Sequence, residues 1–495
     1  MREREVRLSA PGGFRTPAFG EPMGLVPAAQ PAGRFQTSYF DTADLRLARW
    51  GCSLRHRTGE GWTVRLPSGG RGPLLVRSEH VFDPGGEMGR IPDAALDLVH
   101  AYVRDAPVRA VVRLRTVRHV TRLDNLEDTP MADLVLDEVS VLDHNRVVER
   151  FREIEVETTP ATPTETLDVI LEALKGAGAQ PSDNQSKYAR ALGSRATQAP
   201  EVAVVRPGAE ATAGDVVRYA IASSVDRYLR HEPSVRVAED PEAVHQARVA
   251  TRRLRSDLRT FGPLVDEQWT NAIRQELSWL AGLLGGARDA DVLGERLQSR
   301  IESLPLGDQD GGKKLVAGFE LEWTEARAKL LAALREPSYL RLLEHLIEAA
   351  RSPSLTPEAE RPAPEALREL LVRPWRSLRK AVRALGEDPA DEALHQVRIK
   401  AKRVRYAAEA VAPVLGGPAE RFARAAAGLQ ECLGEHQDAV VTGEILRERG
   451  MTDAGDVAFA AGQLAGLERA AALKARSQWP AAWKRLRRAA RKLWP

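Results

Sequence analysis

Glutamates and arginines alternate with apolar residues at both ends of the N-terminal third of the chain. At its start Glu3, Glu5 and Arg7 alternate with Val6 and Leu8. A period of two places the charged side chains on one face of a β-strand and the apolar ones on the other. The same alternation recurs in later segments, with the basic residues in the middle and the acidic ones at the end: Arg55, Arg57, Arg65, Glu153, Glu155 and Glu157.

Two kinds of sheet fit this alternation. If the sheet closes with the charged faces inward, it encloses an acidic patch beside an arginine-rich wall. Carboxylate oxygens suit Mg²⁺ or Mn²⁺, and guanidinium groups suit phosphate oxygens. A half-buried sheet with one solvated face shows the same periodicity, so the pattern alone leaves both open.

A second group of basic residues recurs at helical spacing in the C-terminal part. Residues 244–259 place basic side chains along one helix face for ~20 Å, and an apolar stripe runs one residue earlier. The basic face contains His245, Arg248, Arg252, Arg255 and Arg259. Residues 394–409 repeat it with His395, Arg398, Lys402 and Arg405.

These stripes have few acids to neutralise them. The first copy has five arginines against one acid between Val244 and Arg259. A solvated face is the common meaning of a basic stripe, but unpaired like charge at this density favours a bound anion. His245 and His395 are interpreted either as packed residues at the stripe edge or as phosphate contacts, and Asp289 and Asp438 as helix caps or arginine partners.

The repeat indicates an internal duplication. His395 follows His245 by 150 positions, and Asp438 follows Asp289 by 149. We therefore predict three parts: residues 1–195, a linker at 196–211, and a helical domain at 212–495 with repeats at about 212–351 and 367–495. The predicted fold is multidomain α+β.

Period-two segments predict a mainly antiparallel sheet or barrel in the N-terminal part. A helix is expected at Thr164–Ala177. The expected strands are Glu3–Leu8, Ser53–Arg57, Trp62–Leu66, Leu74–Phe82, Val111–Leu123, Ala132–Leu142 and Val147–Glu157.

Composition narrows the class of protein. The net charge is only +3, so a polyanion partner has to be inferred from where the arginines lie. Cys52 and Cys432 form neither a disulfide framework nor a zinc motif. We expect a cytoplasmic protein without a membrane partner, and we interpret the basic tail at 479–494 as the last bundle helix rather than a membrane-surface helix.

Short motifs follow one another in order through residues 1–195. They are E-x-E-x-R at Glu3, YFDT at Tyr39, SLRHR at Ser53, WTVRLP at Trp62, LRTVR at Leu114, LDEV at Leu136, EIEVE at Glu153 and SKYARAL at Ser186. Together they resemble the CYTH family of triphosphate tunnel metalloenzymes. The resemblance implies an antiparallel eight-stranded β-barrel tunnel that binds a triphosphate and Mg²⁺ or Mn²⁺.

The resemblance also implies roles for individual residues. The metal would be held by Glu3, Glu5, Asp137, Glu153 and Glu155. The triphosphate would be bound by Arg7, Arg55, Arg57, Arg65, Arg118 and Lys187, with Glu79 as a further member. Arg7 replaces the family's usual lysine and stays protonated, so the metal-activated water is expected to be the nucleophile.

The helical part resembles the CHAD family, through the duplicated H-x-x-R-x-x-x-[RK]-[RK]-x-R over about residues 212–494. That resemblance implies an all-α duplicated bundle with pseudo-two-fold halves. It also implies inorganic polyphosphate bound in a basic groove between them, which could place the protein on polyphosphate granules. Repeated guanidiniums suit a repeating anion that needs no base recognition.

The expected function is hydrolysis of inorganic triphosphate or a related triphosphate, combined with polyphosphate binding. A non-catalytic polyphosphate-binding scaffold is the main alternative. A nucleic-acid binder is disfavoured, because aromatic residues are only 5% of the chain and few can stack on bases. A CYTH adenylate cyclase is a minor alternative.

Overall fold

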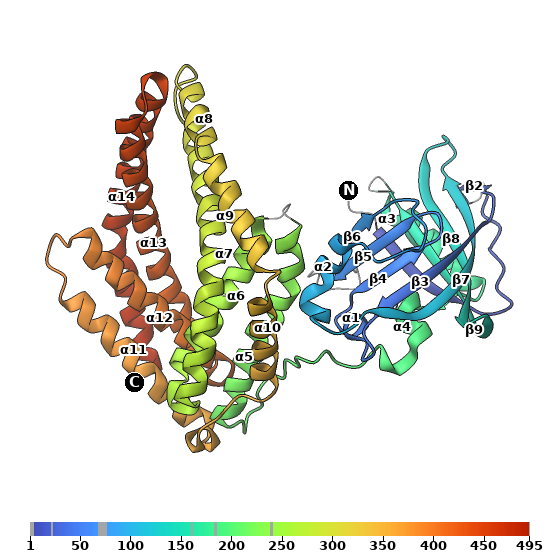
Figure 1. Ribbon diagram of the computed structural model, residues 1–495, viewed down its shortest axis with the longest axis horizontal. Coiled ribbons are helices and arrows are strands. Elements are labelled where there is room, and N and C mark those ends of the chain that lie inside the picture. The colour runs from blue at the N-terminus through green and yellow to red at the C-terminus, as the bar shows by residue number, and fades with distance from the viewer. Residues whose placement is uncertain are drawn as a thin grey trace. The chain divides into compact units, whose positions relative to one another are not determined.

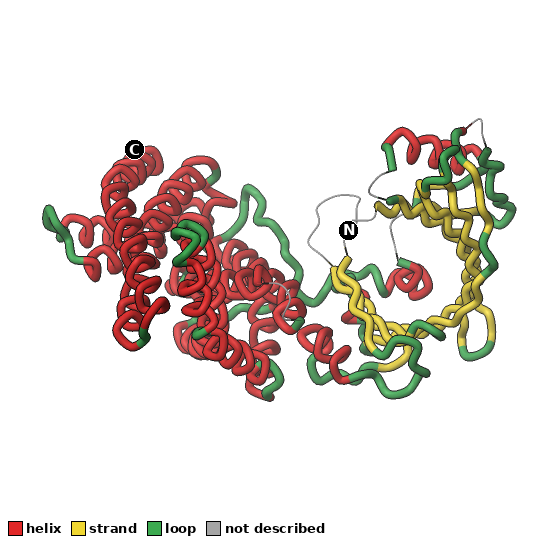
Figure 2. The backbone as a smooth tube through the Cα atoms, turned by 90° about the horizontal axis from the view of Figure 1, so that it is seen from above, coloured by secondary structure: helices red, strands yellow, loops and turns green. Residues whose placement is uncertain are grey.

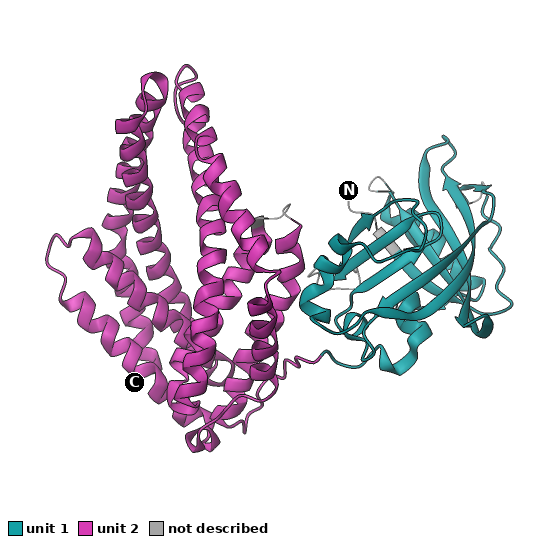
Figure 3. Cartoon of the chain, viewed as in Figure 1, with its two compact units in different colours: residues 1–200 teal, residues 201–495 magenta. Residues whose placement is uncertain are grey.

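The computed structural model describes residues 4–20, 23–67, 77–159, 162–182, 186–237 and 241–494. The chain divides into two compact units, residues 1–200 and 201–495, which are coloured separately in Figure 3. The first contains an antiparallel sheet with short helices, and the second is helical (Figure 1). The fold is therefore α+β, as the two kinds of sequence period predict.

The N-terminal unit is built on one ten-stranded antiparallel sheet. Its strands are β1 (Arg4–Ala10), β2 (Val26–Ala29), β3 (Gly33–Asp41), β4 (Ser53–Arg57), β5 (Gly61–Pro67), β6 (Arg77–Phe82), β7 (Arg109–Asp124), β8 (Pro130–Asp143), β9 (Arg146–Thr158) and β10 (Gln180–Pro181). Their order is β10-β1-β9-β8-β7-β3-β4-β5-β6, with β2 beside β7. Within the described ranges these pairings form an open path, and Figure 2 shows the strands following a strongly curved arc.

The sheet differs from the expected eight-stranded barrel in two ways. It has ten strands, because the two short strands β2 and β10 pair with β7 and β1. Pairing between β6 and the β1 edge is not among the contacts of the described residues. The seven expected strands all correspond to strands of the sheet, although Glu3 and residues 74–76 lie outside the described part.

Strand β3 was not predicted from periodicity. Its C-terminal half is buried on both faces, with Thr37, Ser38, Tyr39 and Asp41 each at most 6% exposed, so no polar alternation marks it. The four-residue α1 (Arg46–Arg49) and helix α2 (Asp93–Val103) were also missed.

Helix α3 (Thr164–Gly176) determines which face of the sheet is apolar. The helix was predicted, and its Ile170 and Leu174 are fully buried against Leu8, Ile154 and Val156. Since side chains alternate along β1 and β9, this packing directs the charged positions of those strands to the opposite face. The last short helix of the unit is α4 (Lys187–Leu192).

The second unit contains ten α-helices within the described residues. They are α5 (Ala213–Arg236), α6 (Pro241–Thr260), α7 (Glu267–Ile301), α8 (Gln309–Ala317), α9 (Glu320–Ala333), α10 (Pro337–Arg351), α11 (Ala363–Arg383), α12 (Asp391–Leu415), α13 (Gly417–Thr452) and α14 (Gly455–Leu493). The first basic stripe lies on α6 and its repeat on α12, and the two helices are in contact.

The apolar stripes beside the basic ones are buried as predicted. On α6, Val244, Ala247 and Leu254 are at most 2% exposed. On α12, Leu394 and Val397 are fully buried. Each helix therefore packs through one flank and keeps its cations on the neighbouring flank.

The tail is the last helix of the bundle. Leu486, Ala490 and Leu493 on α14 are at most 8% exposed and form its packed face. In the middle of the same helix the fully buried Glu468 accepts hydrogen bonds from Arg296 and Arg300, which tie α14 to α7. In the described part of the chain no helix is both long enough and apolar enough to cross a membrane.

Candidate anion-binding sites

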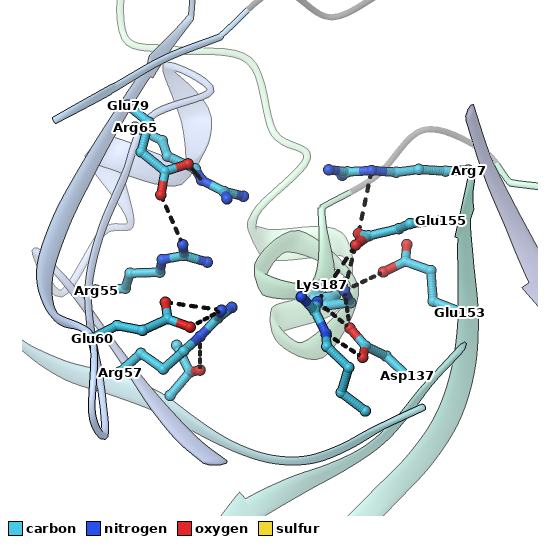
Figure 4. Close-up of polar contacts among 12 residues, drawn as sticks. Arg7, Arg55, Arg57, Glu60, Arg65, Glu79, Asp137, Glu153, Glu155 and Lys187 are labelled. Carbon is cyan, nitrogen blue, oxygen red and sulfur yellow. Dashed lines mark hydrogen bonds and ion pairs between the residues drawn. The ribbon is translucent and has the colours of Figure 1, made fainter. Parts of the chain in front are cut away.

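The acidic side chains of the sheet gather around Lys187, at the start of α4. Its Nζ lies 2.5 Å from Asp137 Oδ2, 3.0 Å from Glu155 Oε1 and 3.3 Å from Glu153 Oε2. The three carboxylates come from β8 and β9, whose register places Asp137 directly beside Glu153. Figure 4 shows the lysine between this acidic wall and an opposite wall of arginines.

Arg118 on β7 is bound to the carboxylates of the acidic wall. Its guanidinium donates two hydrogen bonds to Asp137, from Nε at 2.8 Å and from Nη2 at 2.7 Å. The Arg118 Nη2 atom is also 3.6 Å from Glu155. Arg7 approaches the same carboxylate from β1, with Nε 3.6 Å from Oε1. Two of the expected phosphate ligands therefore already lie against the carboxylates.

The arginines of β4 and β5 form the opposite wall. Glu79 on β6 accepts from Arg55 at 3.1 Å and from Arg65 at 2.7 Å, so one carboxylate holds two guanidiniums in place. Arg57 donates to Glu60 at 2.9 Å. Glu79 is thus a partner of the two arginines, Arg55 and Arg65.

Both walls face one small cavity of about 100 Å³. The Phe35 ring lies beneath both walls, with Arg57 4.3 Å and Arg118 5.5 Å from its centroid. Cation–π contacts of this kind hold guanidiniums in place. The predicted members that line the cavity are Arg7, Arg55, Arg57, Arg65, Arg118, Glu155 and Lys187.

Two of the predicted metal ligands are outside what the structure describes. Glu3 precedes the described residues, and for Glu5 only the backbone is described, opposite Glu157 on β9. Within the described residues, no three His, Cys, Asp or Glu side chains are arranged to hold a metal ion. The roles expected for Glu3 and Glu5 remain predictions.

The remaining carboxylates nevertheless suit a hard divalent cation. Asp137, Glu153 and Glu155 are at most 7% exposed, and all donate oxygen ligands. The buried Glu153 Oε2 receives no hydrogen bond, although it lies near Lys187 Nζ. A cation would satisfy this oxygen.

The protonation tendencies of the cluster follow from burial and charge. Burial alone would lower the pKa of the Lys187 ammonium, but Glu155, Asp137 and Glu153 together raise it. Burial alone would raise the pKa of Asp137, but Arg118 and Lys187 lower it. The pKa of Glu153 is raised by burial and by repulsion from Glu155, against the attraction of Lys187.

Sequence reasoning missed the contacts that position α4. The Tyr188 hydroxyl donates a 2.5 Å hydrogen bond to buried Asp41, whose carboxylate also accepts from the backbone amides of Leu47 and Ala48. The Tyr188 ring stacks on Tyr39, with centroids 4.7 Å apart. Tyr39 and Asp41 belong to the YFDT motif, so the motif explains the placement of the neighbouring Lys187.

Replacing Tyr188 by Phe should loosen α4. The substitution leaves the Asp41 carboxylate short of one donor, at a cost of about 1–3 kcal/mol. Hydrogen exchange monitored by mass spectrometry should show backbone amides of α4 opening roughly tenfold more often. Tyr39→Phe is the matched control, because that hydroxyl has no hydrogen bond among the described residues. Equal exchange in the two variants would show that the Asp41 contact does not hold α4.

In the helical unit, the duplicated arginines have duplicated partners. Arg248 on α6 donates to Asp289 on α7 at 2.6 Å, and Arg398 on α12 lies 3.8 Å from Asp438 on α13. The interpretation of both aspartates as arginine partners is confirmed. Arg253 on α6 pairs with Glu409 on α12, which also accepts from Arg405 at 2.7 Å, so one glutamate joins the two basic helices.

Other cations of the stripes have no carboxylate partner among the described residues. Arg252, Arg255, Arg259 and Lys402 belong to this group. Burial, together with the like charges of Arg248 and Arg398, lowers the pKa of the Arg252 guanidinium. Because Arg398 belongs to the second repeat, the two stripes share one positive field.

The histidines lie at the edge of that field. Burial, followed by the like charge of Arg288, lowers the pKa of His245, although Glu242 opposes the shift. His395 has a buried Nδ1 without a hydrogen-bond partner among the described residues.

Comparison with known proteins gives relatives along nearly the whole chain. The model of the CHAD domain matches residues 219–447. The uncharacterised protein MT2285 of Mycobacterium tuberculosis (strain CDC 1551 / Oshkosh) is 33% identical over 500 residues, covering 93% of this chain and 91% of its own. The uncharacterised protein Rv2226 of the H37Rv strain matches to the same extent.

Solved structures resemble parts of the chain. PptA from Streptomyces chartreusis is 26% identical with a TM-score of 0.47, covering 55% of this chain and 100% of its own. The CHAD domain from Ricinus communis is 27% identical with a TM-score of 0.44, covering 59% of this chain and 95% of its own.

A putative adenylyl cyclase from Hippeastrum, described as having a dominant triphosphatase activity, is distantly similar. It is 18% identical with a TM-score of 0.23 and covers 38% of this chain and 93% of its own. The chain therefore contains a CHAD domain at residues 219–447, and its identity to the two mycobacterial proteins shows that it belongs to one family with them.

Proposed function

We propose that the N-terminal unit is a CYTH-type, divalent-metal-dependent triphosphatase that hydrolyses inorganic triphosphate or a related triphosphate. The observation that carries the proposal is the single cavity between an arginine wall and an acidic wall. Phosphoryl transfer requires charge neutralisation and positioning more than covalent chemistry from the protein. The proposal includes closure of the curved ten-stranded sheet into a tunnel around this cavity.

The arginines and Lys187 around the cavity would bind the triphosphate. Arg55, Arg57 and Arg65 would bind phosphate oxygens from one wall, and Arg118 and Arg7 from the other. Their guanidiniums would neutralise charge that develops on the transferred group. Lys187 would exchange its carboxylate contacts for phosphate oxygens, because an ammonium binds either kind of anion.

Asp137, Glu153 and Glu155, with Glu3 and Glu5, would hold Mg²⁺ or Mn²⁺. When bound, the ion supplies Lewis-acid activation of the phosphoryl group and of the attacking water. Arg7 stays protonated, so it would bind phosphate and would not act as a base.

We further propose that α6 and α12 bind inorganic polyphosphate. The support is the shared positive field of the two stripes and the cations without carboxylate partners. A long anion could contact Arg252 on one helix and Lys402 on the other. This binding would concentrate substrate or bring the protein to cytoplasmic polyphosphate deposits.

The test is ³¹P NMR of the full-length protein with triphosphate, ATP and long-chain polyphosphate, each with and without Mg²⁺. We expect orthophosphate release from triphosphate only with the metal. Line broadening of polyphosphate should occur without turnover. Triphosphate that stays intact under every metal condition would rule out the triphosphatase.

A non-catalytic polyphosphate-binding scaffold is the second candidate. It is favoured by one observation, that the Lys187 ammonium forms ion pairs with Asp137 and Glu155 and so neutralises part of the carboxylate cluster. In the same NMR experiment this candidate predicts broadened triphosphate and polyphosphate signals and no new product peaks.

A further inference from the structure

A second basic cavity lies in the helical unit, apart from the residues of the two stripes. It is formed between α11 and α14 and has a volume of about 390 Å³. That volume falls in the range of small-molecule sites, roughly 300–1,000 Å³. Neither stripe contributes a residue to its lining.

Four arginines and two tryptophans dominate the lining. The α11 side contributes Trp375, Arg376 and Arg379, and the α14 side contributes Arg487, Arg491 and Trp494. On α11 and α14 the arginines and Trp375 recur at three- and four-residue spacing, which directs them to one face, and Trp494 directly follows the end of α14. Each side of the cavity therefore contributes two arginines and one tryptophan.

The cavity has no acidic residue in its lining. None of the four guanidiniums forms an ion pair within the described ranges, and the Arg379 guanidinium lies over the Trp375 ring, 6.0 Å from its centroid. Four like charges around one cavity repel each other unless an anion lies between them. The charge alone thus indicates a ligand with at least two negative groups, such as a phosphate chain.

Two indole rings line the cavity beside Val372 and Ala490. Trp375 and Trp494 are stacked, with centroids 6.3 Å apart and planes 13° apart. Trp375 also packs on Trp483, and Phe422 meets Trp494 edge to face, so the rings are held in place from behind. A bare phosphate chain gains nothing from an indole, whereas a planar base stacks on it.

Helix termini do not account for these charges. The helix dipole favours cations in the last turn of α14, and this explains the position of Arg491. Arg376 and Arg379 lie well inside α11, which continues to Arg383. Convergence of both groups on one cavity therefore needs another explanation.

We propose that this cavity binds a phosphorylated nucleotide, with the base against the tryptophans and the phosphates among the four arginines. The inference does not depend on the proposed triphosphatase. It assigns to the helical unit a small-molecule site in addition to its polyanion surface.

The test is photolabelling of the full-length protein with 8-azido-ATP in EDTA, followed by mass-spectrometric mapping of the labelled peptides. We expect label on the α11 peptide around Trp375 or the α14 peptide around Trp494. Because stacking contributes about 1–3 kcal/mol per base, ATP should protect these peptides at roughly tenfold or more lower concentration than inorganic triphosphate. Labelling of the N-terminal unit would map to different peptides and bears only on the triphosphatase.

Variants separate the two parts of the ligand. Arg376→Gln with Arg491→Gln should reduce labelling of these peptides at least tenfold. Trp494→Leu should weaken protection by ATP more than protection by triphosphate. Arg488→Gln is the matched control, since Arg488 is exposed on α14 and does not line the cavity. Absence of label from both peptides, or equal protection by ATP and triphosphate, would overturn the proposal.

Discussion

Glu153→Gln should reduce kcat/KM for Mg²⁺-dependent triphosphate hydrolysis at least a hundredfold, while the protein still binds triphosphate. The amide keeps the size of the side chain but removes the charge from a buried carboxylate beside Lys187. Loss of one electrostatic contact to a reacting centre typically costs about 3–4 kcal/mol, or a hundredfold or more in rate. Steady-state phosphate release measures the effect.

Glu149→Gln is the matched control for this substitution. Glu149 lies four residues before Glu153 on the same strand, β9, but its side chain is exposed. We expect it to keep the parent rate. Turnover at the parent rate by Glu153→Gln would show that the carboxylate cluster is not the reaction centre. If Glu153→Gln loses turnover, triphosphate binding measured in parallel distinguishes loss of the reaction centre from loss of the fold.

Arg252→Gln combined with Lys402→Gln should weaken binding of polyphosphate about a hundredfold. The two residues are related by the 150-residue repeat and have no carboxylate partner among the described residues. Each charge-assisted hydrogen bond to phosphate contributes about 1.5–3 kcal/mol, so each loss costs roughly tenfold or more. Isothermal titration calorimetry with polyphosphate of defined length, at fixed ionic strength, measures the affinity.

A control for net charge is available on α14. Arg469→Gln with Lys474→Gln removes the same two charges from exposed positions off the basic helices. If binding depends on the total charge alone, both double variants will weaken it equally. If it depends on the α6 and α12 stripes, only the first will weaken it strongly.

Much of the N-terminal site was predictable because strand alternation determines which side chains share a face. Arg55, Arg57, Arg65, Glu153 and Glu155 were placed together from periodicity and motif order. Arg118 contacts Asp137 across β7 and β8, as expected of members of one site. Contacts that depend on tertiary packing were missed, as with Phe35 below the two arginines.

The pairing of Tyr188 with Asp41 shows why contacts that depend on tertiary packing could not be predicted from the sequence. The two residues are 147 positions apart, and Asp41 lies at the end of a strand buried on both faces. Neither residue repeats at a fixed spacing, so the short motifs YFDT and SKYARAL marked the two residues without showing that they pair. In the helical unit, by contrast, the duplication itself predicted that α6 and α12 are equivalent. The cavity between α11 and α14 required the structure, because its two sides come from helices far apart in sequence.

The ion pairs on the basic helices have a consequence for how polyphosphate would be selected. Arg248, Arg398 and Arg405 already have protein carboxylates as internal counterions. A polyanion must exchange those carboxylates for its own charges, whereas at Arg252 it displaces dissolved ions. The salt dependence of binding should therefore be shallower than the number of cations suggests, because its slope counts released ions. Short anions gain too little to displace the carboxylates, so the helix pair would favour long chains over free phosphate.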